Sequence, residues 1–132
     1  MIDRARRAAT KLVLADDDHR LLQALRELLS EAGYTVLGVA PDGPEAVEMA
    51  DELRPDVLIV DHRMPGLSGA DVATVLKARV PGLPVIILSA YDDAGLQVQA
   101  ERIPVAAYLV KGCSARVMFS AIDNAAARST SV

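Results

Sequence analysis

Five short apolar runs divide the chain, and a stretch with helical spacing follows all of them but the fourth. This alternation limits the fold more than any other feature, because strands that alternate with helices form a parallel sheet covered on both faces. Right-handed crossovers leave few ways to wind such a sheet. We therefore expect an α/β, doubly wound fold. The expected strands lie at residues 11–15, 35–39, 57–60, 84–88 and 106–110.

The stretches between the expected strands place apolar residues on one helical face. Asp17 or Asp18 suits the cap of the first helix, and Ser114 suits the cap of the last. Residues 92–102 alternate as a strand would, but their place between two expected strands favours a short helix. The expected inward-facing residues are, helix by helix, Leu21, Leu22, Leu25, Leu28 and Leu29; Ala46, Val47, Ala50 and Leu53; Val72, Ala73, Val75 and Leu76; and Val117, Met118, Ala121, Ile122 and Ala125.

The length of 132 residues favours a single domain. Arg4, Arg6 and Arg7 precede the first strand with no apolar stretch after them, so they do not form a secretory signal. We expect a solvated, frayed tail there rather than a basic binding arm. The expected division is an N-terminal tail at 1–10, a domain at 11–127 and a C-terminal tail at 128–132.

Composition argues against several classes of protein. The net charge of −4, with one Phe and no Trp, disfavours direct binding of nucleic acid. Cys113 is the only cysteine, which excludes an internal disulfide and a zinc cluster and is compatible with a reducing compartment. No apolar run approaches the length of a membrane span. A cytoplasmic protein that does not bind a membrane is expected.

Polar residues stand where four of the five expected strands end. Asp16 and Asp17 follow the first strand, and Asp61 ends the third. Ser89 follows the fourth strand and Lys111 the fifth. In a parallel sheet these ends share one edge, and the crevice at that edge is where such folds bind ligands. The expected site is therefore built around Asp61, with a Pro/Gly-rich loop directly after it.

The three carboxylates of Asp16, Asp17 and Asp61 would repel one another unless a cation joined them. Ligands that offer only oxygen suit a hard cation such as Mg²⁺. A backbone carbonyl in the loop after Asp61, that of Arg63, could complete the set of ligands. The sequence therefore predicts a magnesium site at this edge of the sheet.

The same residues suit phosphoryl transfer. A carboxylate such as Asp61 can act as a nucleophile and form a phosphoryl intermediate. The protein then mainly positions groups and neutralises charge, a role for Mg²⁺ and the Lys111 ammonium. The Ser89 hydroxyl can donate a hydrogen bond to a phosphoryl oxygen, and the small Ala90 leaves room beside it.

Four segments, ADDDH, VDHRMPGLSG, LSA and YLVKG, occur in this order. Together they resemble the receiver domain of bacterial two-component response regulators over about residues 11–127. The resemblance implies a flavodoxin-like sheet with strand order 2-1-3-4-5 and five helices. It also implies that Asp61 accepts a phosphoryl group from a histidine kinase or phosphotransfer protein. Mg²⁺ would be bound by Asp16, Asp17 and the Arg63 carbonyl.

The resemblance extends to the switch and its output. Ser89 and Lys111 would bind the phosphoryl group, and Tyr108 matches an aromatic residue that turns inward when the Ser89 hydroxyl moves. Homodimerisation is expected through the fourth helix, fifth strand and fifth helix. A glycine after the lysine, here Gly112, is common in receivers that precede a helix-turn-helix DNA-binding domain. In a longer regulator, such a domain would follow Val132.

Two other functions fit parts of the sequence. A small phosphatase of the haloacid dehalogenase type would use Asp16 and Asp18 as its D-x-D pair and Asp92–Asp93 as a late acidic pair. The chain lacks the cap insertion expected of that class. A docking module that does not depend on phosphate is the third alternative.

The two histidines offer a further alternative, since either could carry a phosphoryl group in a relay. His19 starts the first expected helix and His62 follows Asp61 directly. Strand alternation turns His62 away from Asp61, so exposed loop histidines are expected instead.

Overall fold

The computed structural model describes residues 4–90 and 104–129, and its sheet has five parallel strands in the order β2-β1-β3-β4-β5. This order confirms the one that the resemblance implied. No expected strand end differs from the observed one by more than one residue. The strands are β1 (Lys11–Ala15), β2 (Thr35–Ala40), β3 (Val57–Asp61), β4 (Val85–Ser89) and β5 (Ala107–Val110).

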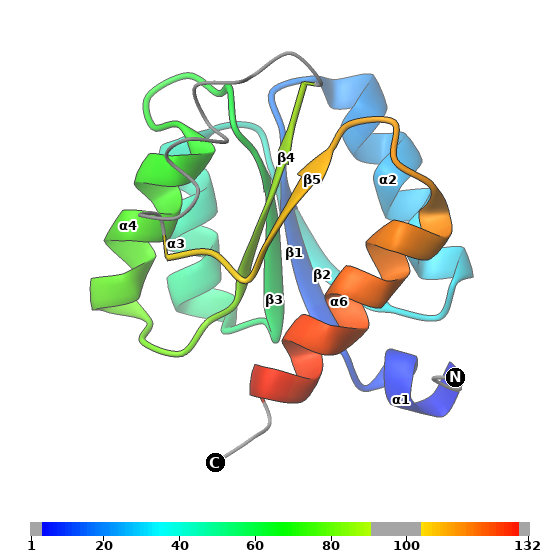
Figure 1. Cartoon of the computed structure of the whole chain (residues 1–132). Helices are drawn as coiled ribbons and strands as arrows, with labels where there is room; N and C mark the ends of the chain where they lie inside the picture. The colour runs from blue at the N-terminus through cyan, green and yellow to red at the C-terminus, as the bar shows by residue number, and fades with distance from the viewer. Residues whose placement is uncertain (1–3, 91–103, 130–132) are drawn as a thin grey trace.

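Helices cover both faces of the sheet, as expected for parallel strands. Figure 1 shows α3 and α4 on one face and α2 and α6 on the other, with α1 at the end where β1 begins. The helix expected at 92–102 falls outside the described residues. The described helices are α1 (Arg4–Ala8), α2 (His19–Glu31), α3 (Gly43–Leu53), α4 (Gly69–Arg79) and α6 (Ala115–Ser129).

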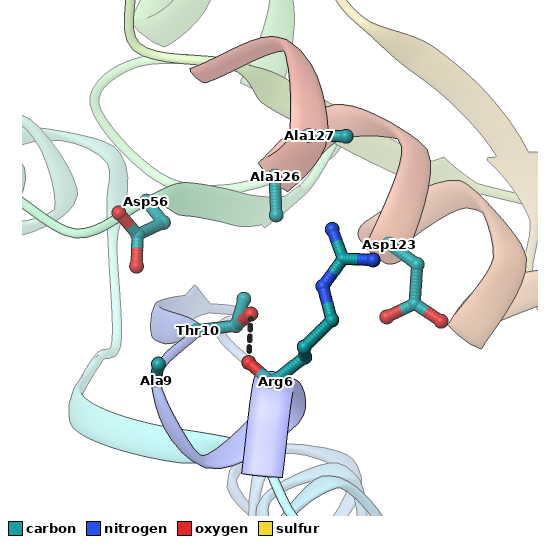
Figure 2. Close-up of a pocket in the computed structure, with 7 residues that line it drawn as sticks. All are labelled: Arg6, Ala9, Thr10, Asp56, Asp123, Ala126 and Ala127. Atoms are coloured by element: carbon teal, nitrogen blue, oxygen red, sulfur yellow. Dashed lines mark hydrogen bonds between the residues drawn. The ribbon is translucent and has the colours of Figure 1, made fainter. Parts of the chain in front are cut away.

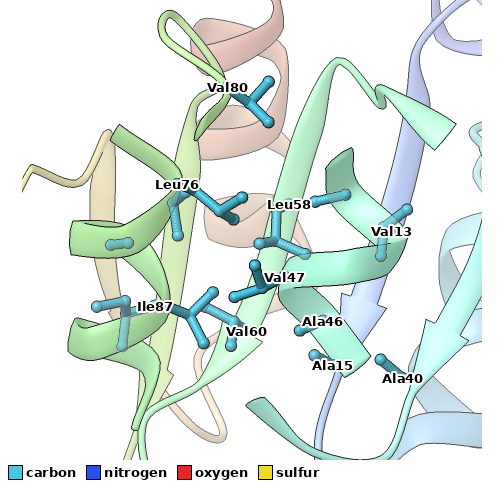
Figure 3. Close-up of a cluster of buried hydrophobic side chains, with 14 residues drawn as sticks. Val13, Ala15, Ala40, Ala46, Val47, Leu58, Val60, Leu76, Val80 and Ile87 are labelled. Carbon is cyan, nitrogen blue, oxygen red and sulfur yellow. The ribbon is translucent and has the colours of Figure 1, made fainter. Parts of the chain in front are cut away.

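The central strand β3 is buried along its whole length, and its side chains alternate between two apolar cores. Figure 3 shows Leu58 and Val60 on the side of α3 and α4, where they pack near Val47 and Leu76. Ile59 faces the other core, which α2 and α6 cover. Each such side chain contributes about 1.5–3 kcal/mol when fully buried. The sheet is therefore a rigid base for whatever stands at its strand ends.

The helices begin at capping residues that the sequence supplies. The Asp18 carboxylate accepts hydrogen bonds from Arg20 N and Leu21 N, which confirms one of the two expected caps of α2. The Ser114 hydroxyl likewise accepts a bond from Val117 N at the start of α6. Gly33 follows α2 with a φ of 108°, a conformation that favours glycine.

The N-terminal segment differs from the frayed tail that we expected. Residues 4–8 form α1, which packs against the rest of the chain. The Thr10 hydroxyl bonds to the Arg6 carbonyl, and the Thr35 hydroxyl bonds to the Ala8 carbonyl. These tertiary contacts stabilise a helix too short to form alone.

Some expected inward-facing residues lie at the borders of the buried faces. Val117 is 48% exposed and Leu53 is 40% exposed, so neither belongs to the core. Leu21 and Leu28 are also exposed, because only the side of the leucine stripe with Leu22, Leu25 and Leu29 is buried. Four apolar residues of α6 are buried: Met118, Ile122, Ala125 and Ala126.

Candidate functional site

The sheet brings the expected polar residues together at one edge. Asp16 follows β1 directly, Asp61 is the last residue of β3, and Ser89 is the last residue of β4. Lys111 follows β5, and its backbone N–H donates to the Ser89 carbonyl over 2.7 Å. The side chains of Asp16, Asp61 and Ser89 are buried, although polar groups are seldom buried without a partner.

Lys111 provides the partner for both buried carboxylates. Its ammonium nitrogen lies 3.0 Å from Asp61 Oδ1 and 3.5 Å from Asp16 Oδ2. The lysine side chain is 31% exposed, so the ion pairs lie at the mouth of the site rather than deep in the core. Asp16 also accepts a hydrogen bond from Asp18 N over 2.9 Å.

Burial and the neighbouring charges shift the pKa values of Asp16 and Lys111. Burial, followed by the negative charge of Asp61, raises the pKa of the Asp16 carboxyl above its usual value. Burial lowers the pKa of Lys111, but its hydrogen bond to Asp61 and the charges of Asp16 and Asp61 outweigh that effect and raise it. The lysine therefore stays charged, while Asp16 lacks part of the positive charge that would hold it ionised.

The chemistry of the cluster fits a divalent cation. Asp16, Asp17 and Asp61 each offer a carboxylate oxygen, and these oxygens lie within 4.8 Å of one another. Asp17 is exposed, so the cluster is open to solvent on one side. One ammonium leaves three carboxylates with an excess of negative charge, and a hard cation with oxygen ligands would neutralise it. The Arg63 carbonyl as a further ligand stays a prediction.

The Ser89 hydroxyl has a partner other than the carboxylates. It forms a short hydrogen bond with the hydroxyl of Tyr108, which projects from β5, the neighbour of β4 in the sheet. The Tyr108 side chain is half-buried and packs against the core on the side of α3 and α4. Ala90, the expected small neighbour, is exposed. The structure thus joins the two residues that the sequence analysis linked as a switch.

Gly43 and Gly69 shape the loop after Asp61, although no role was predicted for either of them. A Cβ at Gly69 would lie 2.8 Å from the Asp61 carbonyl oxygen, and a Cβ at Gly43 would lie 2.3 Å from the Leu67 carbonyl oxygen. The Gly69 N–H also donates to the His62 carbonyl over 2.8 Å. Only glycines let α3 and α4 approach the loop this closely. Gly69 is the last residue of the VDHRMPGLSG segment, and its place in that motif is the sequence feature that could have identified it.

The remaining candidates separate from the site. Asp18 caps α2 and is not placed in the acidic cluster. His19 is exposed as expected, whereas His62 is half-buried rather than exposed. The expected late acidic pair of a phosphatase, Asp92–Asp93, falls outside the described residues. Within residues 4–90 and 104–129, no helix is both long and apolar enough to cross a membrane.

Comparison with known proteins gives a consistent result. The response regulator receiver domain family matches residues 12–123. The transcriptional regulatory protein PdtaR of Mycobacterium tuberculosis is 35% identical over 118 residues, which cover 89% of this chain and 57% of that protein. YdfI of Bacillus subtilis, also a transcriptional regulatory protein, is 35% identical over 115 residues, covering 86% of this chain and 54% of its own. The chain thus spans about half the length of these curated relatives.

Solved structures share the fold as well as part of the sequence. A response regulator receiver domain protein from Clostridium thermocellum superposes with a TM-score of 0.84 at 33% identity, covering 90% of this chain and 95% of the other. The signal receiver domain of NarL from Mycobacterium tuberculosis superposes with a TM-score of 0.78 at 31% identity, covering 89% and 96%.

Proposed function

The chain belongs to the response regulator receiver family and is a phospho-acceptor domain rather than a conventional enzyme, and from that premise we propose that Asp61 is the residue that accepts the phosphoryl group. Asp61 is the acid at the tip of the central buried strand, and its carboxylate faces the Lys111 ammonium. That contact is the observation that carries the proposal, because phosphoryl transfer needs a nucleophile beside a fixed positive charge.

The transfer step forms one bond and breaks another. An oxygen of the Asp61 carboxylate attacks the phosphorus of a phosphorylated histidine, and the new O–P bond forms as the N–P bond breaks. The electron pair of the broken bond stays on the imidazole, which leaves as the neutral ring when its other nitrogen carries a proton. The product is an acyl phosphate on Asp61, which carries about −1.5 to −2 charges in place of the single negative charge of the carboxylate.

The neighbouring side chains hold the new charge. The Lys111 ammonium, 3.0 Å from Asp61 Oδ1, is placed to donate to a phosphoryl oxygen once that oxygen is attached there. Ser89 lies at the tip of the adjacent strand β4 and can donate through its hydroxyl. To do so, the hydroxyl exchanges its partner Tyr108 for the phosphoryl group, so Tyr108 becomes free to move. Ala90 leaves room for the group beside Ser89.

Mg²⁺ is the metal that the ligand set suits. Asp16, Asp17, Asp61 and the Arg63 carbonyl would hold it, and it would supply positive charge to offset the carboxylates and the phosphoryl oxygens. The close approach of three carboxylate oxygens, within 4.8 Å of one another and with one ammonium beside them, supports this assignment.

The partner that donates the phosphoryl group is a histidine kinase or a phosphotransfer protein. The names of PdtaR and YdfI describe transcriptional regulation, and we extend this output to the present protein. Homodimerisation through β5, α6 and the segment before them is part of the same proposal, as is the absence of direct nucleic-acid binding by this domain.

Incubation with acetyl phosphate and Mg²⁺, read by intact mass, tests the proposal. Wild type should gain one phosphoryl group that hydroxylamine removes, and Asp61→Asn should gain none. Asp56→Asn is the matched control, because Asp56 precedes the same strand at its opposite end. A wild type that gains no group under conditions that preserve acyl phosphates would overturn the assignment. A group retained by Asp61→Asn would place the acceptor elsewhere.

The same variants separate this function from a phosphatase. Hydrolysis of p-nitrophenyl phosphate that survives Asp61→Asn but is lost in Asp16→Asn would favour the phosphatase. Activity of that kind is not expected, because the family match identifies a receiver domain.

A further inference from the structure

The side chain of Arg7 attaches the helix α1 to α6. The Arg7 guanidinium lies 5.2 Å from the ring centre of Tyr34 and 5.1 Å from that of Phe119, so it makes a cation–π contact with each of two rings that themselves lie 5.9 Å apart. One of its nitrogens also lies 3.2 Å from Asp123 Oδ2. Phe119 and Asp123 belong to α6, one turn apart. Arg7 therefore combines two cation–π contacts with an ion pair.

The partners of Arg7 are themselves fixed. The Tyr34 hydroxyl donates to Asp123 Oδ1 over 2.6 Å, and only 3% of the Tyr34 residue is exposed. Both oxygens of Asp123 are thus engaged, one by Tyr34 and one by Arg7. The side chains of Arg7 and Asp123 are only 21% and 12% exposed, so water screens this pair less than a surface ion pair. The four residues Arg7, Tyr34, Phe119 and Asp123 are called the clamp below.

The backbone holds α1 at the start of the sheet. Thr35 N donates to the Thr10 carbonyl over 3.1 Å, and the Thr35 hydroxyl donates to the Ala8 carbonyl over 2.7 Å. Figure 2 shows α1 facing Ala126, Ala127 and Asp123 of α6 across a pocket of about 280 Å³. The clamp consequently joins α6 to the sheet at the end opposite the acidic cluster (Figure 1).

The other end of α6 is joined to the phospho-acceptor site. Lys111, which contacts Asp61, is followed by Gly112 with a φ of 92° and by Cys113, whose N–H donates to the Val110 carbonyl. The helix starts four residues after Lys111, at Ala115. A displacement of Lys111 therefore moves the start of α6 as well, because only the tight loop of residues 112–114 separates them. The helix has one end that the site can move and one end that the clamp restrains.

We propose that α1 is a restraint that fixes the C-terminal half of α6, so that the part of the response to phosphorylation that reaches this helix through Lys111 stays within residues 111–118. The second part rests on the proposed function of Asp61, whereas the restraint itself does not. Loss of the clamp loosens residues 119–127 and lets the response spread along the whole helix. Arg7 thus acts as a positioning residue, through Asp123 and Phe119, on a helix that it does not belong to.

Hydrogen exchange followed by mass spectrometry on the full chain tests both parts. Four proteins are compared: wild type, Arg7→Ala, Arg7→Lys and Arg116→Ala. Arg7→Lys keeps the charge but loses the planar group that stacks on the rings. Arg116→Ala removes an exposed arginine from α6 itself and is the matched control. Each is measured alone and with Mg²⁺ and beryllofluoride, which imitates an acyl phosphate on a carboxylate.

In the absence of beryllofluoride, Arg7→Ala should accelerate exchange in residues 119–127 by roughly tenfold, because local opening there loses both ring contacts and the ion pair. Arg7→Lys should give a smaller acceleration and Arg116→Ala none. Should Arg7→Ala fail to fold, as judged by circular dichroism, the comparison of Arg7→Lys with Arg116→Ala carries the same test. Unchanged exchange in the folded Arg7 variants would overturn the restraint.

With beryllofluoride, the change in exchange that wild type shows between residues 111 and 127 should be limited to 111–118, and in the Arg7 variants it should reach 119–127 as well. A wild-type response that already reaches residue 127, or identical responses in wild type and the Arg7 variants, would overturn the confinement. If wild type does not respond to beryllofluoride at all, the proposed function of Asp61 and the confinement both fail. The restraint then stands or falls on the measurement without beryllofluoride.

Discussion

Two residues at the strand ends, Asp16 and Asp61, are both buried and charged. Asp16 and Asp61 are buried because they end central strands, yet both are charged groups that burial disfavours. Lys111 relieves part of this conflict through its two ion pairs, and the raised pKa of Asp16 marks the part that is left. Any ligand that brings positive charge would therefore stabilise the buried carboxylates. A phosphoryl group on Asp61 would increase that stabilisation, because it adds negative charge.

Tyr108→Phe should strengthen the binding of beryllofluoride with Mg²⁺. In wild type the Ser89 hydroxyl must give up its bond to Tyr108 before it can donate to the new group. A net hydrogen bond contributes about 1 kcal/mol, so its prior removal should raise the apparent affinity about fivefold. Calorimetric titration measures this, with Ser89→Ala as the counterpart that should bind more weakly. Equal affinities of Tyr108→Phe and wild type would show that the Ser89–Tyr108 bond does not oppose ligand binding.

Tyr34 should make the stability of the fold depend on alkaline pH. Burial and the bond to Asp123 raise the pKa of the Tyr34 hydroxyl above its ordinary value of 10.0. The folded chain keeps that proton where the unfolded chain releases it, so the contribution is complete below about pH 10 and is lost as the pH rises further. Urea unfolding from pH 8 to 11 should show wild type losing stability relative to Tyr34→Phe. Parallel curves for the two proteins would contradict this.

The residues of the site could be named from the sequence because strand ends of a parallel sheet must meet at one edge. Asp16, Asp61, Ser89 and Lys111 were identified by that argument. Arg7 could not be, since its partners Tyr34 and Phe119 are distant in sequence and no local pattern joins them. Long-range stacking of this kind becomes visible only once the helices are packed.

At the scale of elements, the chain is tightly packed at the junction between β3 and α4. Gly69 begins α4 directly against the backbone of Asp61 and His62, and Ser68 closes a capping box with Asp71. The helix start therefore fixes the loop that follows the phospho-acceptor. Glycine is required there for space.

Gly69→Ala should lower the free energy of unfolding by about 1–3 kcal/mol, the usual cost of overpacking. The added Cβ would lie 2.8 Å from the Asp61 carbonyl oxygen, so the strand end or the helix start must shift. The same shift should slow phosphorylation by acetyl phosphate. Thr74→Ala, on the exposed side of α4, is the control and should change stability by less than about 0.5 kcal/mol. A Gly69→Ala protein as stable and as reactive as wild type would show that the junction adapts freely.

Elements with enough residues to show a period could be predicted, and the others could not. The five strands and four of the described helices follow from apolar spacing. No strand end was predicted with an error of more than one residue. The helix α1 has five residues, too few for a period, and its first turn carries arginines rather than apolar groups. Its stability comes from contacts with β2 and α6, which spacing does not reveal.

At the scale of the whole molecule, the clamp restrains α6 where the strands begin, and the acidic cluster that would bind ligands lies where the strands end. The acidic cluster lies at the edge where the strands end, and α1 lies at the edge where they begin (Figure 1). The strand order could be inferred from the family resemblance together with the handedness of crossovers. The attachment of α1 to α6 could not, because it depends on the tertiary position of both helices.

Occupation of the acidic cluster should stabilise the entire fold. A ligand that binds only the folded state adds about 2.7 kcal/mol at a hundredfold excess over its dissociation constant, which corresponds to several degrees in the midpoint of thermal unfolding. Mg²⁺ with beryllofluoride should therefore raise that midpoint in wild type, and removal of Mg²⁺ with EDTA should reverse the shift.

Asp61→Asn provides the decisive comparison for this last prediction. It removes the oxygen that beryllium would bind but leaves the buried packing of β3 nearly unchanged. The thermal shift should be lost in Asp61→Asn and kept in Asp56→Asn, whose carboxylate accepts a bond from Lys11 N at the other end of the sheet. Fluoride or Mg²⁺ given alone should not reproduce the full shift. Equal shifts in Asp61→Asn and wild type would mean that the stabilising ligand binds away from Asp61, and the nucleophile would have to be sought among the other carboxylates.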